Sequence, residues 1–100
     1  MKNTWINKNS DALFTAVLKL ERLDEARRFF RDLLTEQEIE EFANRWKVAR
    51  MLAEKKSYIA IEKETGMSST TIARISKWLN GKLGGYKLAI NKSVNHHLPA

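Results

Sequence analysis

The stretch SYIAIEKETGMSSTTIARISKWLN, residues 57–80, decides the fold that the sequence predicts. Ser57 is a preferred N-cap residue, and we expect it to begin a short helix that ends at Gly66, where glycine adopts a left-handed backbone at low cost. Ser68 then caps a second helix that runs to about Asn80. The apolar side chains expected to pack between the two helices are Ile61, Met67, Ile72 and Ile75. Two helices joined by so tight a turn are typical of the helix-turn-helix motif.

The outer side of the second helix carries small hydroxyl side chains followed by basic ones. Such a front is narrow enough to enter the major groove of DNA, and Arg74 and Lys77 can reach guanine edges or phosphates. We therefore predict that the protein binds double-stranded DNA. The residues predicted to contact DNA are Ser68, Ser69, Thr70, Thr71, Ala73, Arg74 and Lys77, with further phosphate contacts from Lys55, Lys56 and Lys82.

The charge of the chain is consistent with a polyanionic partner. Its 18 basic and 12 acidic side chains give a formal net charge of +6, and residues 57–100 carry six basic and two acidic side chains. Basic domains often bind nucleic acid. However, many basic proteins do not bind DNA, and a glycine turn between helices also occurs in helical bundles that bind nothing. Charge and turn together still leave a plain bundle as an alternative.

The rest of the chain is also predicted to be helical, which gives an all-α protein with one domain over residues 1–100. Ser10 and Asp11 are expected to cap a helix over 11–20, and a second helix is expected over 23–34. Thr35 and Glu38 form a capping box for a third helix that ends near Lys55.

Residues 11–55 are rich in large apolar side chains, which either form the core of a plain bundle or are buried against a second copy of the chain. The small size of the protein, 100 residues, favours dimerisation. A short last helix is expected over 86–92, followed by a flexible tail over 93–100.

Several classes of protein are excluded by the sequence. No apolar run is long enough to span a membrane, and the polar N-terminus does not look like a secretory signal. The absence of cysteine fits an intracellular protein and removes thiolate chemistry. His96 and His97 have no acidic neighbour and do not form a metal site. No nucleophile and base can be paired, so we expect neither catalytic residues nor a bound metal.

Residues 33–79 resemble the tryptophan repressor family, and more closely its YerC/YecD branch. The resemblance rests on Leu33-Leu34-Thr35 at the start of a helix, on Arg45 within that helix, and on Thr71-Ile72-Ala73-Arg74 after the turn. It implies an intertwined homodimer whose N-terminal helices interlock and whose two helix-turn-helix heads face successive major grooves. It also places the family's DNA contacts on Ser68 to Thr71 and the turn that follows.

The same resemblance implies an effector pocket at Leu34, Thr35, Arg45, Arg74, Ile75 and Trp78. Ile75 stands where the family has a glycine, and Trp78 stands where it has a small serine. These larger side chains are expected to fill the slot that an indole ligand would need. We therefore expect no cofactor and no role for tryptophan as a co-repressor.

The function that the sequence predicts is sequence-specific DNA binding by a homodimeric transcription regulator, a repressor without enzymatic activity. Such a protein would act in the cytoplasm, at the nucleoid. Two alternatives stay open. One is a helical adaptor that binds proteins and not DNA, although the hydroxyl-rich face of residues 69–80 lacks apolar anchors. The other is a DNA-binding replication factor, because this helical head also resembles that of bacterial replication initiators.

Overall fold

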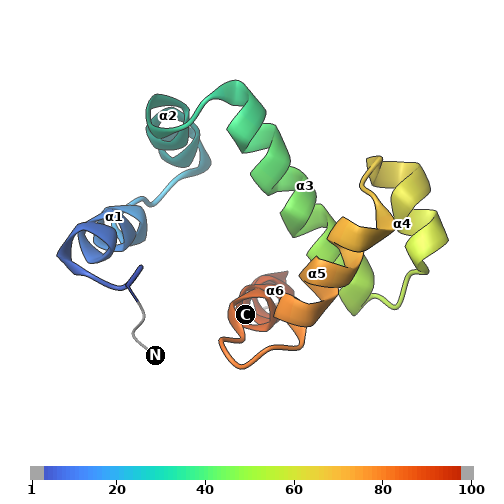
Figure 1. Cartoon of the computed structure of the whole chain (residues 1–100). Helices are drawn as coiled ribbons and strands as arrows, with labels where there is room; N and C mark the ends of the chain where they lie inside the picture. The colour runs from blue at the N-terminus through green and yellow to red at the C-terminus, as the bar shows by residue number, and fades with distance from the viewer. Residues whose placement is uncertain (1–3, 98–100) are drawn as a thin grey trace. The chain divides into compact units, whose positions relative to one another are not determined.

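The computed structural model describes residues 4–97, which form six α-helices and no β-strand (Figure 1). The all-α prediction is confirmed. Within the described range, no helix combines the length and the apolar character that crossing a membrane requires. The helices are α1 (Lys8–Leu18), α2 (Leu23–Leu33), α3 (Glu36–Ala53), α4 (Tyr58–Thr65), α5 (Ser69–Leu79) and α6 (Gly85–His97).

The chain divides into two compact units, Met1–Ile39 and Glu40–Ala100. The first unit contains α1, α2 and the first turn of α3, and the second contains the rest of α3 with α4, α5 and α6. Neither α1 nor α2 contains a buried residue. The first unit therefore has no enclosed core of its own.

The helix starts in the first unit follow from side-chain caps. α1 begins three residues earlier than predicted because Asn7, and not Ser10 or Asp11, is its N-cap. The Asn7 carboxamide accepts a hydrogen bond from the Ser10 backbone N–H at 2.9 Å, and the Ser10 hydroxyl accepts one from the Asn7 N–H at 2.9 Å. Two residues that are each good N-caps therefore share one capping box, in which Ser10 takes the N3 position.

The capping box predicted for α3 is confirmed. The Glu38 N–H donates to Thr35 Oγ1 at 3.1 Å, and the Thr35 N–H donates to a Glu38 carboxylate oxygen at 2.9 Å.

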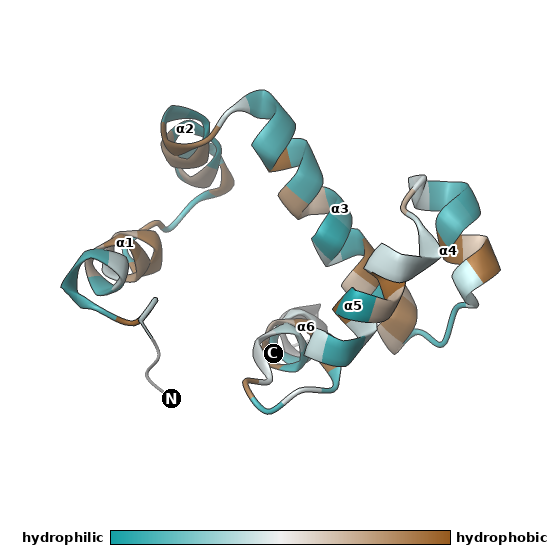
Figure 2. Cartoon of the chain, viewed as in Figure 1, coloured by the Kyte–Doolittle hydropathy of each residue, from teal (hydrophilic) through white to brown (hydrophobic). Residues whose placement is uncertain are grey.

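The apolar residues of the first unit, brown on α1 and α2 in Figure 2, are exposed or half-buried. Leu18 is 83% exposed and Leu23 is 67% exposed. Trp5 contacts Phe14 edge to face at a centroid distance of 6.5 Å, yet each keeps about half of its surface exposed. Exposed apolar side chains in this number are unusual on a surface that faces only water.

The second unit has a well-defined core, built from Val48, Ala49 and Met51 of α3, Ile61 of α4, and Ile72, Ile75 and Leu79 of α5. The predicted pair of helices is present as α4 and α5. Ser57 caps α4, Gly66 ends it with a left-handed backbone (φ 74°), and Ser68 caps α5. An ion pair between Lys47 Nζ and Glu64 Oε2, 3.0 Å long, also joins α3 to α4.

The turn that follows α3 contains the one described residue other than glycine with a positive φ, Lys55 at 66°. The Lys55 N–H donates to the Leu52 carbonyl at 3.0 Å, and the Lys56 N–H donates to the Met51 carbonyl at 3.1 Å. This is the Schellman pattern, in which the left-handed residue is usually glycine. A side chain there costs about 1–2 kcal/mol of backbone strain.

The last helix is longer than the sequence predicts. We expected a helix over 86–92 and a tail over 93–100, but α6 continues to His97, so residues 93–97 are helical. The Ser93 hydroxyl donates to the Ala89 carbonyl at 2.9 Å within this helix. No proline interrupts the chain before Pro99, which removes the main reason for an earlier end. The remainder of the predicted tail, residues 98–100, lies outside the described residues.

Candidate nucleic-acid interface

One side of α5 is held in the core and the opposite side is free. Ile72, Ile75 and Leu79 are buried, so the helix cannot rotate about its axis without breaking the core. The exposed side chains on its other faces are Ser69, Thr70, Ala73, Arg74, Lys77 and Trp78. The fold therefore presents five of the predicted DNA contacts on one fixed helix.

The predicted run of four hydroxyl residues separates into two pairs. The Ser68 hydroxyl accepts a hydrogen bond from the Thr71 N–H at 3.2 Å and donates to Thr71 Oγ1 at 3.1 Å. Ser68 and Thr71 are thus used in starting the helix, and Thr71 is also half-buried. Ser69 and Thr70 are exposed, and their hydroxyls make no hydrogen bond within the described residues. These two are the hydroxyl side chains best placed to contact a ligand.

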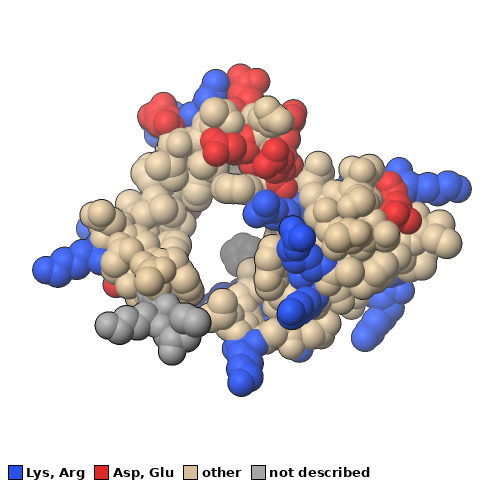
Figure 3. Space-filling model, viewed as in Figure 1, with Lys and Arg blue, Asp and Glu red and all other residues tan. Residues whose placement is uncertain are grey.

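The basic side chains predicted to contact DNA have no acidic partner among the described residues, whereas Lys47 of the same unit pairs with Glu64. Among residues 4–93, no carboxylate lies within ion-pair distance of Arg74 or Lys77, and none pairs with Lys55 or Lys56. The sequence contains no Asp or Glu after Glu64. Figure 3 shows the resulting group of Lys and Arg side chains over the α5 and α6 side of this unit. The unit therefore presents a positive surface.

Lys55 and Lys56 lie in the turn between α3 and α4, and both are exposed. Lys55 also lines a polar cleft of about 490 Å³ between the end of α3, the C-terminal half of α5, and α6. The polar residues that line this cleft are Lys55, Ser76, Asn80, Lys87 and Asn91. Of these, only Lys55 was predicted from the sequence as a site residue. Lys87 could have been noticed as one of the unbalanced cations after Glu64.

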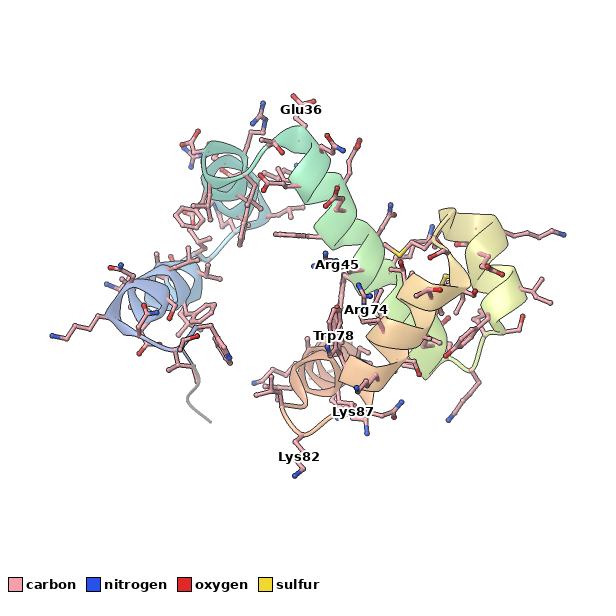
Figure 4. The ribbon with its side chains drawn as sticks, viewed as in Figure 1. Glu36, Arg45, Arg74, Trp78, Lys82 and Lys87 are labelled. Carbon is pink, nitrogen blue, oxygen red and sulfur yellow. The ribbon has the colours of Figure 1, made fainter. Side chains whose placement is uncertain are left out.

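The residues of the predicted effector pocket differ in burial, and they belong to different units of the chain. Ile75 is completely buried in the core of the second unit. Arg45 of α3 is exposed, as are Arg74 and Trp78 of α5. Figure 4 shows the three residues in a row, with Arg74 between the other two. The Arg45 guanidinium lies 5.5 Å from the centre of the Phe42 ring.

The two remaining predicted pocket residues belong to the first unit, where Leu34 is half-buried and Thr35 is exposed. Thr35 Oγ1 accepts the hydrogen bond that caps α3.

A second, apolar groove was not predicted. It has a volume of about 500 Å³ and is lined by Trp78, Gly81, Lys82, Leu83, Gly85 and Tyr86. Trp78 remains 48% exposed, so it forms a wall of this groove and does not fill it. Only the aromatic residues flanking a glycine-rich loop could have indicated the groove in the sequence.

Comparison with known proteins supplies the family. A sequence model of the Trp repressor protein family matches residues 8–94. The chain is 45% identical over 85 residues to the uncharacterized protein YerC of Bacillus subtilis strain 168, covering 85% of this chain and 82% of that protein.

Two solved structures share the fold. A TrpR-like protein from Eubacterium eligens superposes with a TM-score of 0.86 at 36% identity, covering 99% of this chain and all of the other. A candidate Trp repressor from Staphylococcus aureus gives a TM-score of 0.84 at 33% identity over 90% of each chain. The Trp repressor-like fold and the YerC-type resemblance predicted from the sequence are therefore confirmed.

Proposed function

Because the chain belongs to the Trp repressor family, we propose that it is a DNA-binding transcription regulator, and specifically a repressor that recognises duplex sequences as a homodimer. The observation that carries this proposal is the exposed, carboxylate-free face of α5, fixed by three buried residues on its opposite side. A rigid helix with short hydroxyl side chains followed by cations fits the major groove of B-form DNA.

The contacts divide by chemistry. Ser69, Thr70 and Arg74 reach base edges and supply selectivity, since a guanidinium can form two hydrogen bonds with guanine. Lys77 contacts phosphates, with Lys55, Lys56 and Lys82 at the turns around the two helices. These contacts supply affinity without sequence preference and make binding strongly dependent on salt. Ser68 and Thr71 contribute indirectly, because their hydroxyls fix the start of the reading helix.

The homodimer is proposed because the apolar surface of the first unit is left uncovered in the single chain. With no buried residue in α1 or α2, this unit cannot be stable unless its apolar surface is covered. A second copy is the simplest partner that supplies a matching apolar surface, and two-fold symmetric dimers are the most common oligomers. A symmetric dimer also presents two α5 helices to two half-sites of one operator.

Tryptophan is not proposed as the effector. The family's arginine pair is kept as Arg45 and Arg74, but Ile75 is a core residue and Trp78 places an indole of its own beside Arg74. The α4–α5 helix-turn-helix is then held in place by the side chains of the protein itself, without a ligand. The proposed protein uses no cofactor, catalyses no reaction, and acts in the cytoplasm on the nucleoid.

The test is binding of the purified protein to duplex DNA across a range of salt, first to random sequence and then to an operator selected from a random pool. A regulator gives salt-dependent binding to both and a large preference for the selected operator. Lack of any duplex binding at low salt would instead favour the adaptor, whose apolar groove at Trp78 and Tyr86 would bind a protein partner. Bound sites confined to a replication origin would favour the replication factor.

A further inference from the structure

The polar cleft beside α5 contains two cations and no acid. Lys55 lines it from the turn after α3 and Lys87 lines it from α6, while Ser76, Asn80 and Asn91 supply neutral polar groups. The other lining residues are apolar: Leu52, Ala53, Leu79 and Ile90. Figure 4 shows Lys87 near the C-terminal end of α5. The Asn80 carboxamide donates one hydrogen bond to the Ser76 carbonyl at 2.9 Å and keeps a second N–H. A cleft with this composition fits an anion.

The cleft is continuous with the exposed face of α5. Asn80 lies three residues after Lys77 and seven after Ala73, and these spacings put the three side chains on neighbouring positions of one helix face. A DNA major groove is bordered on both sides by phosphates. A duplex that accepts α5 in its groove therefore brings one of its strands past the flank where Asn80 and the cleft lie.

The backbone of Lys55 gives an independent reason to assign a function to the cleft. Its left-handed conformation is one that glycine adopts without strain, and the Schellman hydrogen bonds need only the backbone of this residue. Within the described residues, the Lys55 side chain forms no hydrogen bond and no ion pair. A strained residue whose side chain the fold does not use points to a use outside the fold.

We propose that the cleft holds a backbone phosphate of the DNA strand that borders the groove read by α5. Lys55 and Lys87 are its two cations, and Asn80 donates an amide hydrogen bond. This inference rests on the proposed function. It adds a second set of contacts, between the cleft and the DNA backbone, which anchors the duplex beside α5. Lys55 and Lys87 contribute affinity and not sequence preference, because a phosphate is the same at every base pair.

A purely structural role for Lys55 predicts different results. A cation near the last turn of α3 interacts favourably with the negative end of the helix dipole. If that were its only role, replacing it would change stability and leave DNA binding unaltered. Asparagine is the informative replacement, because it tolerates the left-handed conformation and carries no charge.

The experiment compares Lys55→Asn, Lys87→Gln and the double variant with the wild-type protein. Binding is measured on the selected operator and on random duplex, from low to high salt. We expect each single variant to bind both DNAs several-fold more weakly, with a smaller slope of log affinity against log salt. The double variant removes both cations from one phosphate in each of the two protomers, and should therefore reduce the slope by about 1.8. Lys55→Arg keeps the charge and should retain wild-type binding.

Two controls make the outcome decisive. Lys19→Gln removes one charge from the first unit and should leave the slope unchanged. Lys55→Gly should raise the thermal unfolding midpoint by about 4–8 °C and still weaken DNA binding. Wild-type slopes in Lys55→Asn and Lys87→Gln would overturn the cleft contact while leaving the proposed function intact. Failure of the wild-type protein to bind any duplex would overturn both.

Discussion

The indole ring of Trp46 stacks on the phenol ring of Tyr86, with centroids 6.3 Å apart and ring planes inclined by 21°. The contact joins the middle of α3 to the start of α6, and both rings pack against the core of the second unit. No residue of α6 up to Ser93 is buried, and Tyr86 and Ile90 are its half-buried apolar residues, so this stack is one of two apolar anchors of the helix. It fixes the start of α6, where Tyr86 lines the apolar groove and Lys87 lines the polar cleft.

Replacing Tyr86 by alanine should release α6. Removal of a large aromatic side chain costs about 3–5 kcal/mol when it is fully buried, and Tyr86 is half-buried. We expect a loss of about 1–3 kcal/mol in the free energy of unfolding, measured by urea denaturation. Tyr86→Phe keeps the ring and should be close to the wild type. An unchanged urea midpoint in Tyr86→Ala would show that α6 is held by other contacts.

Gly66→Ala should destabilise the protein through the backbone alone. Gly66 has a φ of 74°, and a Cβ atom built at this position meets no atom within 4 Å. The expected loss is therefore the cost of a left-handed alanine, about 1–2 kcal/mol, seen as a lower unfolding midpoint. Gly85→Ala is the matched control, because a Cβ there also meets no atom within 4 Å and its φ is not left-handed. Equal effects of the two substitutions would contradict this account.

Arg74 and Lys77 should differ in what they contribute to DNA binding. Arg74→Ala should weaken binding to a selected operator by about 1–3 kcal/mol and relax preference at the base pair it contacts. Lys77→Ala should weaken binding to all duplexes alike and reduce the salt slope by about 1.8, because the dimer loses one phosphate contact in each protomer. Fluorescence anisotropy on operator and random DNA separates the two effects. Operator binding that survives both substitutions would exclude α5 as the reading helix.

The protein should sediment as a dimer at micromolar concentration, with twice the mass of the 11.6 kDa chain. Leu18 is 83% exposed at the end of α1, and we expect Leu18→Glu to shift the equilibrium toward monomer because a charge would be buried in the interface. Asn9→Glu adds the same charge to a polar position of α1 and should leave the dimer intact. A wild-type species of a single chain mass would refute the dimer.

L-tryptophan should neither bind to the protein nor strengthen its binding to DNA. The slot that an indole would need beside α5 has lost its small residues: Ile75 belongs to the core, and Trp78 brings an indole of its own. Isothermal calorimetry with L-tryptophan should give no heat of binding, and operator affinity should be the same with and without it. Millimolar or tighter binding that strengthens operator affinity would overturn this prediction.

Much of the fold could be predicted because helix ends are determined by local chemistry. Ser57, Gly66 and Ser68 fix the ends of α4 and α5 through their own hydrogen bonds or backbone. The start of α1 was missed because Asn7 and Ser10 are both good caps, and only their reciprocal hydrogen bonds decide between them. The length of α6 was missed because its sequence has a weak apolar pattern.

The site was predicted less completely, because part of it depends on contacts between distant segments. The exposed face of α5 follows from helical periodicity, so Ser69, Thr70, Arg74 and Lys77 could be selected in advance. The cleft could not, since it exists only where α6 packs beside α5 and brings Lys87 near Lys55. Nor could the strain at Lys55, because nothing in the residues Glu54 to Ser57 indicates a left-handed lysine.

The lack of buried side chains in α1 and α2 has a consequence for gene dosage. If the first unit is ordered only when two chains pair, the number of competent molecules grows with the square of the chain concentration until pairing saturates. A cell that halved its supply of chains below that point would lose about three quarters of its competent molecules. Repression would then switch over a narrow range of protein abundance, with no small molecule required.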